Sequence, residues 1–394
     1  MDETLRGTRM TTPTTRSRRL VAAAASCTVV LGAAAFGGHA SGATDTTVPG
    51  GSGDAAVAGT DGGAAPLPTL ADASGITIGV DFPRADTDFW TSYNAYVPQF
   101  ADQLGVDLLP PTNSENDIQK LVANVSSLAN RGAQSIVMAP QDTGAIVSTL
   151  DDLATQGINV VSIDTRPDSG PVYMVVRADN QAYGEKACRY LGETLAGTGN
   201  VVEFQGDLAS VNGRDRSEAF ASCMSDNYPD IHVFEIPTEW KGDKAAAGLQ
   251  TVLTQTDDAV DGIYMQAGGA FLAPTLALLD SQGLLVPAGQ DGHIAIVSND
   301  GIPQELDAIR DGSIDATVSQ PADSYAYYGL YYAIAAAQGL TFAAGPTDHG
   351  STIVELPNGL EDQLPAPLVT RDPGTFGDFE SIGVDDTSLW GNNL

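Results

Sequence analysis

Short apolar runs alternate with helical segments over most of the chain, and this alternation constrains the fold more than any other feature of the sequence. The runs hold four or five residues each, a length typical of buried strands. They span residues 76–80, 135–138, 159–163, 201–204, 262–265, 294–297 and 316–319. Between them, apolar residues recur at helical spacing, as at Leu121, Val125 and Leu128. Repeated strand–helix units with short glycine-containing connections predict parallel sheets covered by helices on both faces.

The alternation falls into two blocks, residues 75–178 and 179–320, and one aromatic-rich helix over residues 324–337 follows them. A chain of 394 residues is also long enough for two domains. We therefore predict an α/β protein with two doubly wound, Rossmann-like lobes built on parallel sheets. In such sheets, ligands bind beyond the carboxyl ends of the strands, so the residues that follow each strand are the candidates for function.

The first 43 residues have the features of a secretory signal. Five arginines accompany an apolar run over residues 20–36, and small residues surround Ala40 and Ala43, where cleavage is expected. Residues 44–73 are rich in Gly, Ala, Thr, Asp and Pro, a composition that predicts a flexible linker. The protein is therefore expected to act outside the cytoplasm, whether periplasmic, secreted or tethered to the outer face of the membrane.

The three cysteines fit this export prediction. Cys27 lies within the predicted signal, where it is either removed with the signal or lipidated after cleavage. Cys188 and Cys223 fall in helical segments of the same predicted lobe, and an oxidising compartment permits a disulfide between them. Two buried free thiols are the alternative.

Charge and motifs exclude several classes of function. The chain has 50 acidic and 18 basic side chains, a net charge of −32, and such a surface repels nucleic acid. The sequence has no nucleophile elbow, phosphate-binding loop lysine or dinucleotide fingerprint. Its histidines have no Cys or Glu partner at a metal-ligand spacing. We therefore predict neither an enzyme nor a cofactor or metal site.

Aromatic, acidic, basic and amide side chains follow the predicted strands. The candidate ligand-binding residues are Phe89, Trp90, Asp164, Arg166, Arg214, Trp240, Asp300 and Gln320. This mixture suits a carbohydrate, because aromatic rings stack on the apolar faces of a sugar. Carboxylates, guanidinium groups and amides exchange hydrogen bonds with its hydroxyls. A site built in this way also rejects analogues that lack those hydroxyls.

Each candidate also has a structural interpretation. Phe89 and Trp90 have the spacing of core residues, Arg214 could form an exposed ion pair, and Asp300 before Gly301 could shape a turn. Asp164 and Asp300 could in principle serve as an acid–base pair, although holding hydroxyls fits this setting better.

Several ordered segments of residues 76–356 resemble the ribose-type periplasmic sugar-binding proteins. The matching segments are Phe89-Trp90, Ile163-Asp164, Arg177-Ala178-Asp179-Asn180, Arg214-Asp215-Arg216-Ser217-Glu218-Ala219-Phe220, Trp240, Asn299-Asp300-Gly301 and Thr317-Val318-Ser319-Gln320. The resemblance implies a type I periplasmic-binding-protein fold, with a hinge of three crossings near Asp179, Gln320 and the segment after Thr352. The expected N-terminal lobe is 75–178 plus 321–350, the C-terminal lobe 179–320 plus 351–375, and 376–394 form a tail.

The same resemblance implies that Phe89, Trp90 and Trp240 lie along a ligand. It also implies that Asp164, Arg214, Asp300 and Gln320 bind the hydroxyls of that ligand. Two departures stand out in the sequence. Arg166 comes one position later than the basic residue of the family, and Ala267-Gly268-Gly269 replaces a polar contact. The first loop is slightly long, so that Asp81, Arg84 or Asp86 could reach the site.

The function implied by the resemblance is capture of a sugar or polyol between the lobes. The ligand-loaded, closed protein would then deliver it to the permease and ATPase subunits of an ABC importer. The expected binding protein is a monomer without a cofactor. Presentation of the closed form to a sensory or chemoreceptor system is the alternative.

Overall fold

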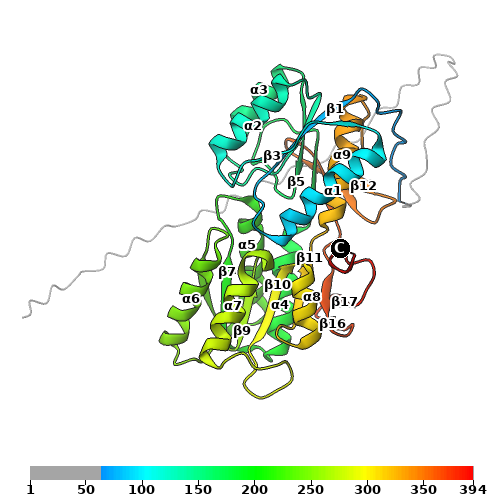
Figure 1. Ribbon diagram of the computed structural model, residues 1–394. Helices are drawn as coiled ribbons and strands as arrows, with labels where there is room; N and C mark the ends of the chain where they lie inside the picture. Colours follow the sequence, from blue (N-terminus) through cyan, green and yellow to red (C-terminus); the bar gives the residue numbers. More distant parts are fainter. Residues whose placement is uncertain (1–63, 394) are drawn as a thin grey trace, which may run out of the picture. The chain divides into compact units, whose positions relative to one another are not determined.

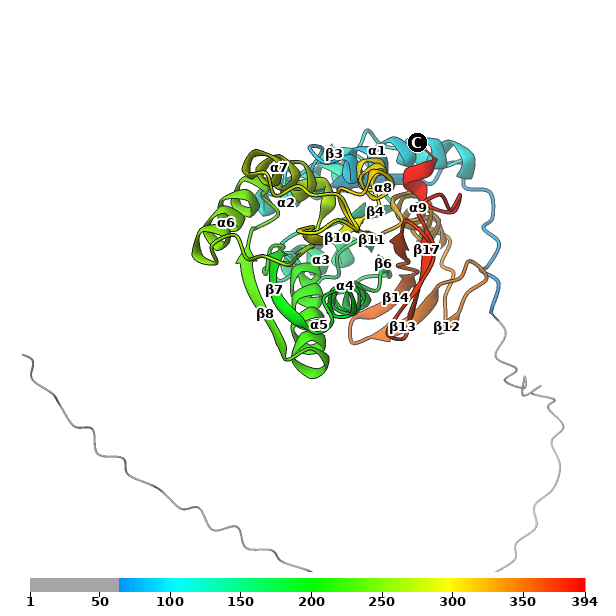
Figure 2. The same ribbon diagram turned by 90° about the horizontal axis from the view of Figure 1, so that it is seen from below.

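The computed structural model describes residues 64–393. The predicted signal over residues 1–43, with Cys27, and residues 44–63 of the predicted linker lie outside this range. The described part forms two α/β lobes, each built on one sheet (Figures 1 and 2). Among its helices, none has both the length and the apolar character needed to cross a membrane.

The N-terminal lobe has a nine-stranded sheet with the order β12-β13-β14-β6-β5-β4-β1-β2, and β3 pairs with β1. Its strands are β1 (Thr77–Phe82), β2 (Asp107–Leu108), β3 (Thr112–Asn113), β4 (Ser135–Met138), β5 (Asn159–Ile163), β6 (Met174–Ala178), β12 (Gly345–Pro346), β13 (Thr352–Leu356) and β14 (Gly359–Leu364). Its helices are α1 (Asp88–Leu104), α2 (Ile118–Asn130), α3 (Val147–Thr155) and α9 (Ala322–Ala337). Helix α9 packs on α1, β4 and β5, so the chain returns to this lobe after leaving it.

The C-terminal lobe has an eight-stranded sheet with the order β16-β17-β15-β11-β10-β9-β7-β8. Its strands are β7 (Thr198–Gln205), β8 (Asp230–Pro237), β9 (Gly262–Met265), β10 (Ala295–Asp300), β11 (Ala316–Ser319), β15 (Leu368–Thr370), β16 (Thr375–Phe376) and β17 (Phe379–Gly383). Its helices are α4 (Asn180–Thr194), α5 (Val211–Asn227), α6 (Gly242–Gln255), α7 (Gly268–Gln282), α8 (Pro303–Asp311) and the 3-10 turn η1 (Trp390–Asn392).

Local sequence explains where the helices begin and end. Thr87 caps α1 by accepting a hydrogen bond from the Trp90 amide, and Asp179 caps α4 in the same way through Gln181 and Ala182. Helix α1 ends at Gly105, whose positive φ of 70° suits glycine. The seven predicted strands are all present, as β1, β4, β5, β7, β9, β10 and β11. The central strands pair in parallel, and this confirms the predicted α/β class.

The end of the chain is placed differently from the prediction. Strands β13 and β14 belong to the N-terminal sheet, where β14 pairs with β6, so residues 352–364 were assigned to the wrong lobe. The third crossing therefore lies at residues 365–367. Strand β17 of the predicted tail, and β16 at the boundary between the predicted lobe and tail, belong to the C-terminal sheet. These strands escaped prediction because several of their pairings are antiparallel at the sheet edges, where one face is exposed and apolar runs are short.

The predicted linker also ends earlier than expected. Residues 65–73 lie against the N-terminal lobe: Ala65 forms a bridge with Thr347, and the Tyr331 hydroxyl donates to the Pro68 carbonyl at 2.5 Å. Leu67 and Leu70 pack on the core beneath. Two leucines within five residues are enough to dock an otherwise polar segment, because each buries apolar area.

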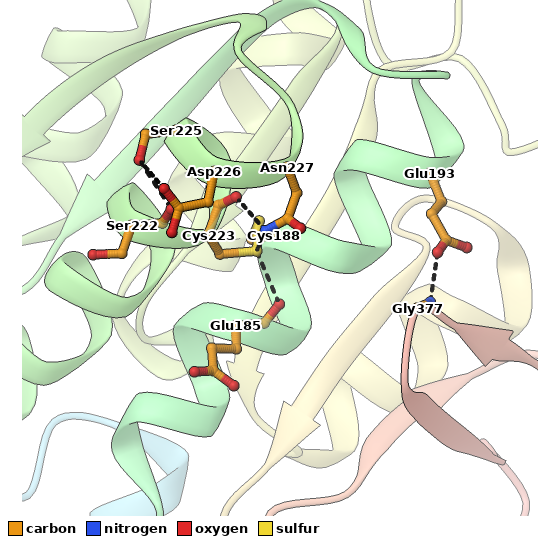
Figure 3. Close-up of a disulfide and its surroundings, with 9 residues drawn as sticks. All are labelled: Glu185, Cys188, Glu193, Ser222, Cys223, Ser225, Asp226, Asn227 and Gly377. Carbon is orange, nitrogen blue, oxygen red and sulfur yellow. Dashed lines mark hydrogen bonds between the residues drawn. A yellow bond between two sulfur atoms is a disulfide. The ribbon is translucent and has the colours of Figure 1, made fainter.

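The predicted disulfide between Cys188 and Cys223 is present and joins α4 to α5, with 6.1 Å between the two Cα atoms. Figure 3 shows it between the two helices, where the Glu185 carbonyl and the Asn227 amide lie nearby. The two helices also approach closely at Gly184, where an added Cβ would come within 2.3 Å of the Arg216 carbonyl oxygen. The disulfide thus covalently fixes the helix that carries several site residues.

Candidate functional site

A cavity lies between the two lobes, at the carboxyl ends of the strands, where the fold predicts a ligand. Its lining residues come from both lobes and from the crossing after β11. They are Arg84, Thr87, Phe89, Trp90, Gln141, Asp164, Asn212, Arg216, Trp240, Ala267, Ala270, Asp300 and Gln320. Six of the eight predicted ligand-binding residues are among them, and Arg166 and Arg214 are not.

The aromatic side of the cavity is built by α1 and by the loop after β8. Phe89 and Trp90, on the first turn of α1, meet edge to face with ring centroids 5.2 Å apart. Both are largely buried and pack on the N-terminal core, and both also line the cavity. They are therefore core residues and part of the cavity wall at the same time. Trp240 contributes a third ring from the opposite lobe. Flat apolar faces are therefore available from both lobes.

Arg216 is the guanidinium group at the centre of the site. It is buried on α5, and its Nε donates to the Asn180 Oδ1 at 2.7 Å. Its Nη1 donates to the Gln266 carbonyl, and its Nη2 lies 3.3 Å from Gln320 Oε1. The Tyr183 and Trp240 rings lie 4.8 and 5.7 Å from its Cζ, so the group is held between aromatic faces. It is fixed in place before any ligand arrives.

Arg214 was the predicted guanidinium, and the structure places it elsewhere. Two positions along an α-helix turn a side chain by about 200°, so Arg214 and Arg216 point in nearly opposite directions. Arg214 Nη2 donates to Asp168 Oδ1 at 2.6 Å and lies 3.4 Å from the Thr143 hydroxyl. It therefore binds the N-terminal lobe outside the cavity.

Arg166 lies outside the cavity lining as well. Its guanidinium nitrogens are 3.9 Å from Asp215 Oδ2 and 3.7 Å from Glu361 Oε2. The neighbouring Arg177 donates to Asp215 Oδ2 at 2.9 Å, so the two arginines share one carboxylate of the C-terminal lobe. This ionic cluster joins the lobes near the first crossing.

Asp164 and Asp300 are buried carboxylates from opposite lobes. Burial raises the pKa of Asp164 to about 6, although Arg216, Arg177 and a hydrogen bond from Asn212 oppose the shift. Burial also raises the pKa of Asp300 to about 7, and the negative charge of Asp164 acts in the same direction. A ligand that donates hydrogen bonds to these carboxylates would favour their ionised forms and so lower their pKa values.

The Asp300 side chain is oriented by neighbours on both sides. Its Oδ2 accepts from the Gly269 amide at 2.9 Å, and its Oδ1 accepts from Gln320 Nε2 at 3.0 Å. Gly268 has no room for a side chain, because an added Cβ would lie 2.0 Å from Glu305 Oε1. The glycines at 268 and 269 thus allow the backbone to approach Asp300 and Glu305. The wall at Ala267 and Ala270 carries no polar side chain.

Three lining residues have a positive φ angle, which is uncommon for residues other than glycine. The φ angles of Asp164, Trp240 and Asp300 are 61°, 58° and 122°. Such conformations cost free energy and persist where the surrounding structure enforces them, typically at functional sites. Three of the nine positive-φ residues other than glycine in the described part of the chain thus line this one cavity.

Five polar lining residues were not among the eight predicted ligand-binding residues. They are Arg84, Thr87, Gln141, Asn212 and Arg216. Two of them carried a usable signal: Gln141 is the first polar side chain after β4, and Asn212 lies one helical turn before Arg216 on α5. Arg84 was considered as a residue within reach, and its Nη1 donates to the Trp240 carbonyl of the opposite lobe at 3.2 Å.

Two similar lobes, three crossings and a polar–aromatic cavity between them define a solute-binding protein of the clamshell type. A family model described as periplasmic binding protein domain matches residues 78–341, and the chain belongs to this family. The family is one of non-enzymatic solute-binding proteins that act outside the cytoplasm, and its relatives include sugar and polyol binders of ABC importers.

The names of several similar proteins state that they bind small hydroxyl-rich molecules. The ribose import binding protein RbsB of Salmonella typhimurium is 26% identical over 64% of this chain and 82% of its own length. The xylitol-binding protein of Mycolicibacterium smegmatis is 25% identical over 58% of this chain and 63% of its own length. A solved ABC transporter solute binding protein from Mycobacterium smegmatis with bound glycerol is 25% identical. The structural match covers 69% of this chain and 91% of that protein's chain, with a TM-score of 0.63. The Caulobacter myo-inositol binding protein shares the fold, with a TM-score of 0.64 and 23% identity. The match covers 78% of this chain and 96% of that protein's chain.

Proposed function

We propose that this protein captures a neutral sugar or polyol between its lobes and delivers it to the permease and ATPase subunits of an ABC importer. The observation that carries the proposal is the cavity itself. Two carboxylates, one fixed guanidinium and the amides of Gln141, Asn212 and Gln320 surround it, beside three aromatic rings. Hydroxyl groups both donate and accept hydrogen bonds, so a polyhydroxylated ligand can pair with every one of these groups.

The charge balance of the cavity favours a neutral ligand over an anion. Asp164 and Asp300 face it together with Arg216 and Arg84, so two potential negative charges meet two positive ones. Arg84 also pairs with Asp86, at 2.5 Å between Nε and Oδ1, which leaves less of its charge for an anion. A carboxylate or phosphate ligand would have to approach two buried acids, and this costs more than binding hydroxyls.

Binding would act through closure of the lobes. The cavity is lined by residues of both lobes, so a ligand makes all its contacts only when the lobes are together. It therefore stabilises the closed form by its differential affinity for the two forms. The closed form is the one we expect the importer to recognise.

A direct test is calorimetry and thermal denaturation of the purified protein with D-ribose, D-allose, xylitol, myo-inositol and glycerol. At 100 times the dissociation constant, the true ligand should stabilise the fold by about 2.7 kcal/mol. Glucuronate serves as the anionic control. Stabilisation by glucuronate alone would contradict the proposal of a neutral ligand. Deletion of the gene should then abolish uptake of the radiolabelled ligand, whereas intact uptake with a lost growth response would favour a sensory role.

A further inference from the structure

We propose that the C-terminal strap, residues 385–393, is a positioning element of the ligand site, and that Trp390 acts through Asp300 and Phe89. The inference rests on the proposed function and goes beyond it, since the strap does not line the cavity. Trp390 is 2% exposed and anchors the segment between the lobes. In Figures 1 and 2 the red end of the chain lies beside α8 and α9, which belong to different lobes.

Trp390 contacts one site residue from each lobe. Its Nε1 donates to the Asp300 carbonyl at 3.2 Å, and its ring meets Phe89 edge to face with centroids 5.9 Å apart. Asp300 is the lining residue with the most unusual backbone, at a φ of 122°. A buried hydrogen bond to the carbonyl of such a residue helps to hold a conformation that the chain would otherwise leave.

The next residue fits the same corner closely. An added Cβ at Gly391 would lie 2.3 Å from the Gly301 carbonyl oxygen, so only glycine permits this approach. The strap therefore packs closely against the Asp300-Gly301 turn, although none of its residues lines the ligand cavity. On the cavity side the same Asp300 accepts hydrogen bonds from Gly269 and Gln320.

Arg310 of α8 ties the strap to the C-terminal lobe. Its Nε donates to Asp385 Oδ1 at 2.9 Å, and its Nη2 donates to Asn392 Oδ1 at 2.6 Å. Asn392 in turn donates to the carbonyls of Val384 and Asp386 at 2.9 Å. The strap is thus a fixed loop of the C-terminal lobe, and its contact with Phe89 is a contact between lobes.

The strap also lies beside the hinge. Leu389 and Trp390 line a cavity of about 290 Å³ together with Pro321, which follows the second crossing, and Pro365 and Pro367 of the third. Because the lobes rotate about these segments, an element that touches both lobes here contributes to the closed arrangement. Loss of Trp390 should loosen Asp300 and remove one contact that favours closure.

Three variants test this role. Trp390→Ala removes both contacts, whereas Trp390→Phe keeps a ring against Phe89 and removes only the donor to Asp300. The control is Phe376→Ala, which removes another aromatic side chain of the C-terminal region. Phe376 packs on Tyr190, with ring centroids 4.6 Å apart, and does not line the ligand cavity.

The first readout is hydrogen–deuterium exchange of the ligand-free protein. We expect Trp390→Ala to raise exchange at the Gly269 and Gly301 amides, with β7 and β8 unchanged, and Trp390→Phe to have a smaller effect. The second readout is the affinity for whichever of D-ribose, D-allose, xylitol, myo-inositol and glycerol binds the wild type most tightly. Trp390→Ala should lower this affinity by about tenfold, and Phe376→Ala by less than about twofold.

The outcomes separate this inference from the proposed function. Unchanged exchange at Gly269 and Gly301 in Trp390→Ala would overturn the positioning role, and so would unchanged affinity. Increased exchange throughout the lobe would show a merely structural role and would also overturn it. If the wild type bound no member of the panel while exchange rose only at the Asp300 corner, the ligand class would be wrong and the positioning role would stand.

Discussion

Arg214 Nη2 donates a hydrogen bond to Asp168 Oδ1 across 2.6 Å, and this bond joins α5 of the C-terminal lobe to the loop after β5 of the N-terminal lobe. Both side chains are partly exposed, at 33% and 43%. Exposed ion pairs of this kind contribute about 0.2–1 kcal/mol. Because the pair joins the lobes, its contribution belongs to the closed form and adds to the apparent affinity for a ligand.

We therefore expect Arg214→Ala to weaken ligand binding by about two- to fivefold, in line with the size of an exposed pair. Asp168→Asn should have a similar effect, and the double variant should be no weaker than either single one. Raising the ionic strength should reduce the difference in ligand affinity between the wild type and Arg214→Ala. Calorimetry at two salt concentrations measures the ligand affinity of the wild type, the two single variants and the double variant. A loss above about tenfold in Arg214→Ala alone would instead indicate direct contact with the ligand.

Trp240→Ala should weaken binding by at least about tenfold, or ~1.4 kcal/mol. The ring lines the cavity and lies 5.7 Å from the Arg216 Cζ, so its loss removes a stacking face and loosens the guanidinium. Trp240→Phe, which keeps a smaller aromatic face, should recover part of the affinity. Titration calorimetry of the three proteins is the measurement, and equal affinities would exclude Trp240 from the site.

Arg84→Met tests whether the first loop helps to close the cavity. In the wild type, Arg84 Nη1 donates to the Trp240 carbonyl at 3.2 Å, and this hydrogen bond joins the two lobes. The variant keeps an apolar side chain of similar length but cannot form this hydrogen bond. We expect affinity to fall by about tenfold, mainly through faster dissociation, because the closed form loses a contact. Stopped-flow measurement separates the two rate constants. A slower association with unchanged dissociation would contradict the closing role.

The apolar pattern of the sequence predicted the central strands, and the strand ends together with the family resemblance pointed to six residues that line the cavity. Buried parallel strands are continuous apolar runs, and the residue after each run, as at Asp164, lies at the carboxyl edge of the sheet. The choice between Arg214 and Arg216 could not be made in this way. It depends on the rotation of α5 about its axis, which the pattern of this helix does not define, since Arg216 is buried like an apolar residue.

The strands of the C-terminal region could not be predicted either, because their burial depends on partners that are distant in the sequence. Strand β13 mixes exposed and buried positions, and β14 has two consecutive buried acidic residues, Glu361 and Asp362, where an apolar run would be expected. Glu361 and Asp362 are compensated by partners from distant segments, such as Arg177 and Tyr332, which a local pattern cannot show. The hydrogen bond from Trp390 to the Asp300 carbonyl likewise follows only from the tertiary fold.

Replacement of both Cys188 and Cys223 by Ser should lower the free energy of unfolding by about 2–4 kcal/mol, because the bond closes a loop across 35 residues. Ligand affinity should change by less than about twofold, since neither cysteine lines the cavity. Chemical denaturation and calorimetry of the double variant measure the two quantities. Wild type treated with a reductant is the matched control, and an affinity loss comparable to that of Trp240→Ala would show that the bond also positions α5.

Glu203 provides a test of pH dependence outside the cavity. It is buried on β7, where burial raises its pKa to about 8 despite a hydrogen bond from Gln266 to its Oε1 at 2.8 Å. The folded protein therefore keeps a proton that the unfolded chain releases above its ordinary pKa of 4.5. The resulting stability is fully present below pH 4.5 and is lost as the pH rises through about 8.

Glu203→Gln removes this titration and keeps an acceptor for Gln266. The variant should be close to the wild type in stability at pH 5 and more stable at pH 9, by on the order of 2 kcal/mol or more. Denaturant unfolding at both pH values measures the difference. Other buried acids, such as Asp300, titrate in both proteins, so the comparison isolates Glu203. Parallel stability curves for the two proteins from pH 5 to 9 would show that Glu203 is already ionised in the folded state at pH 5, because a charged carboxylate there would leave no proton to lose.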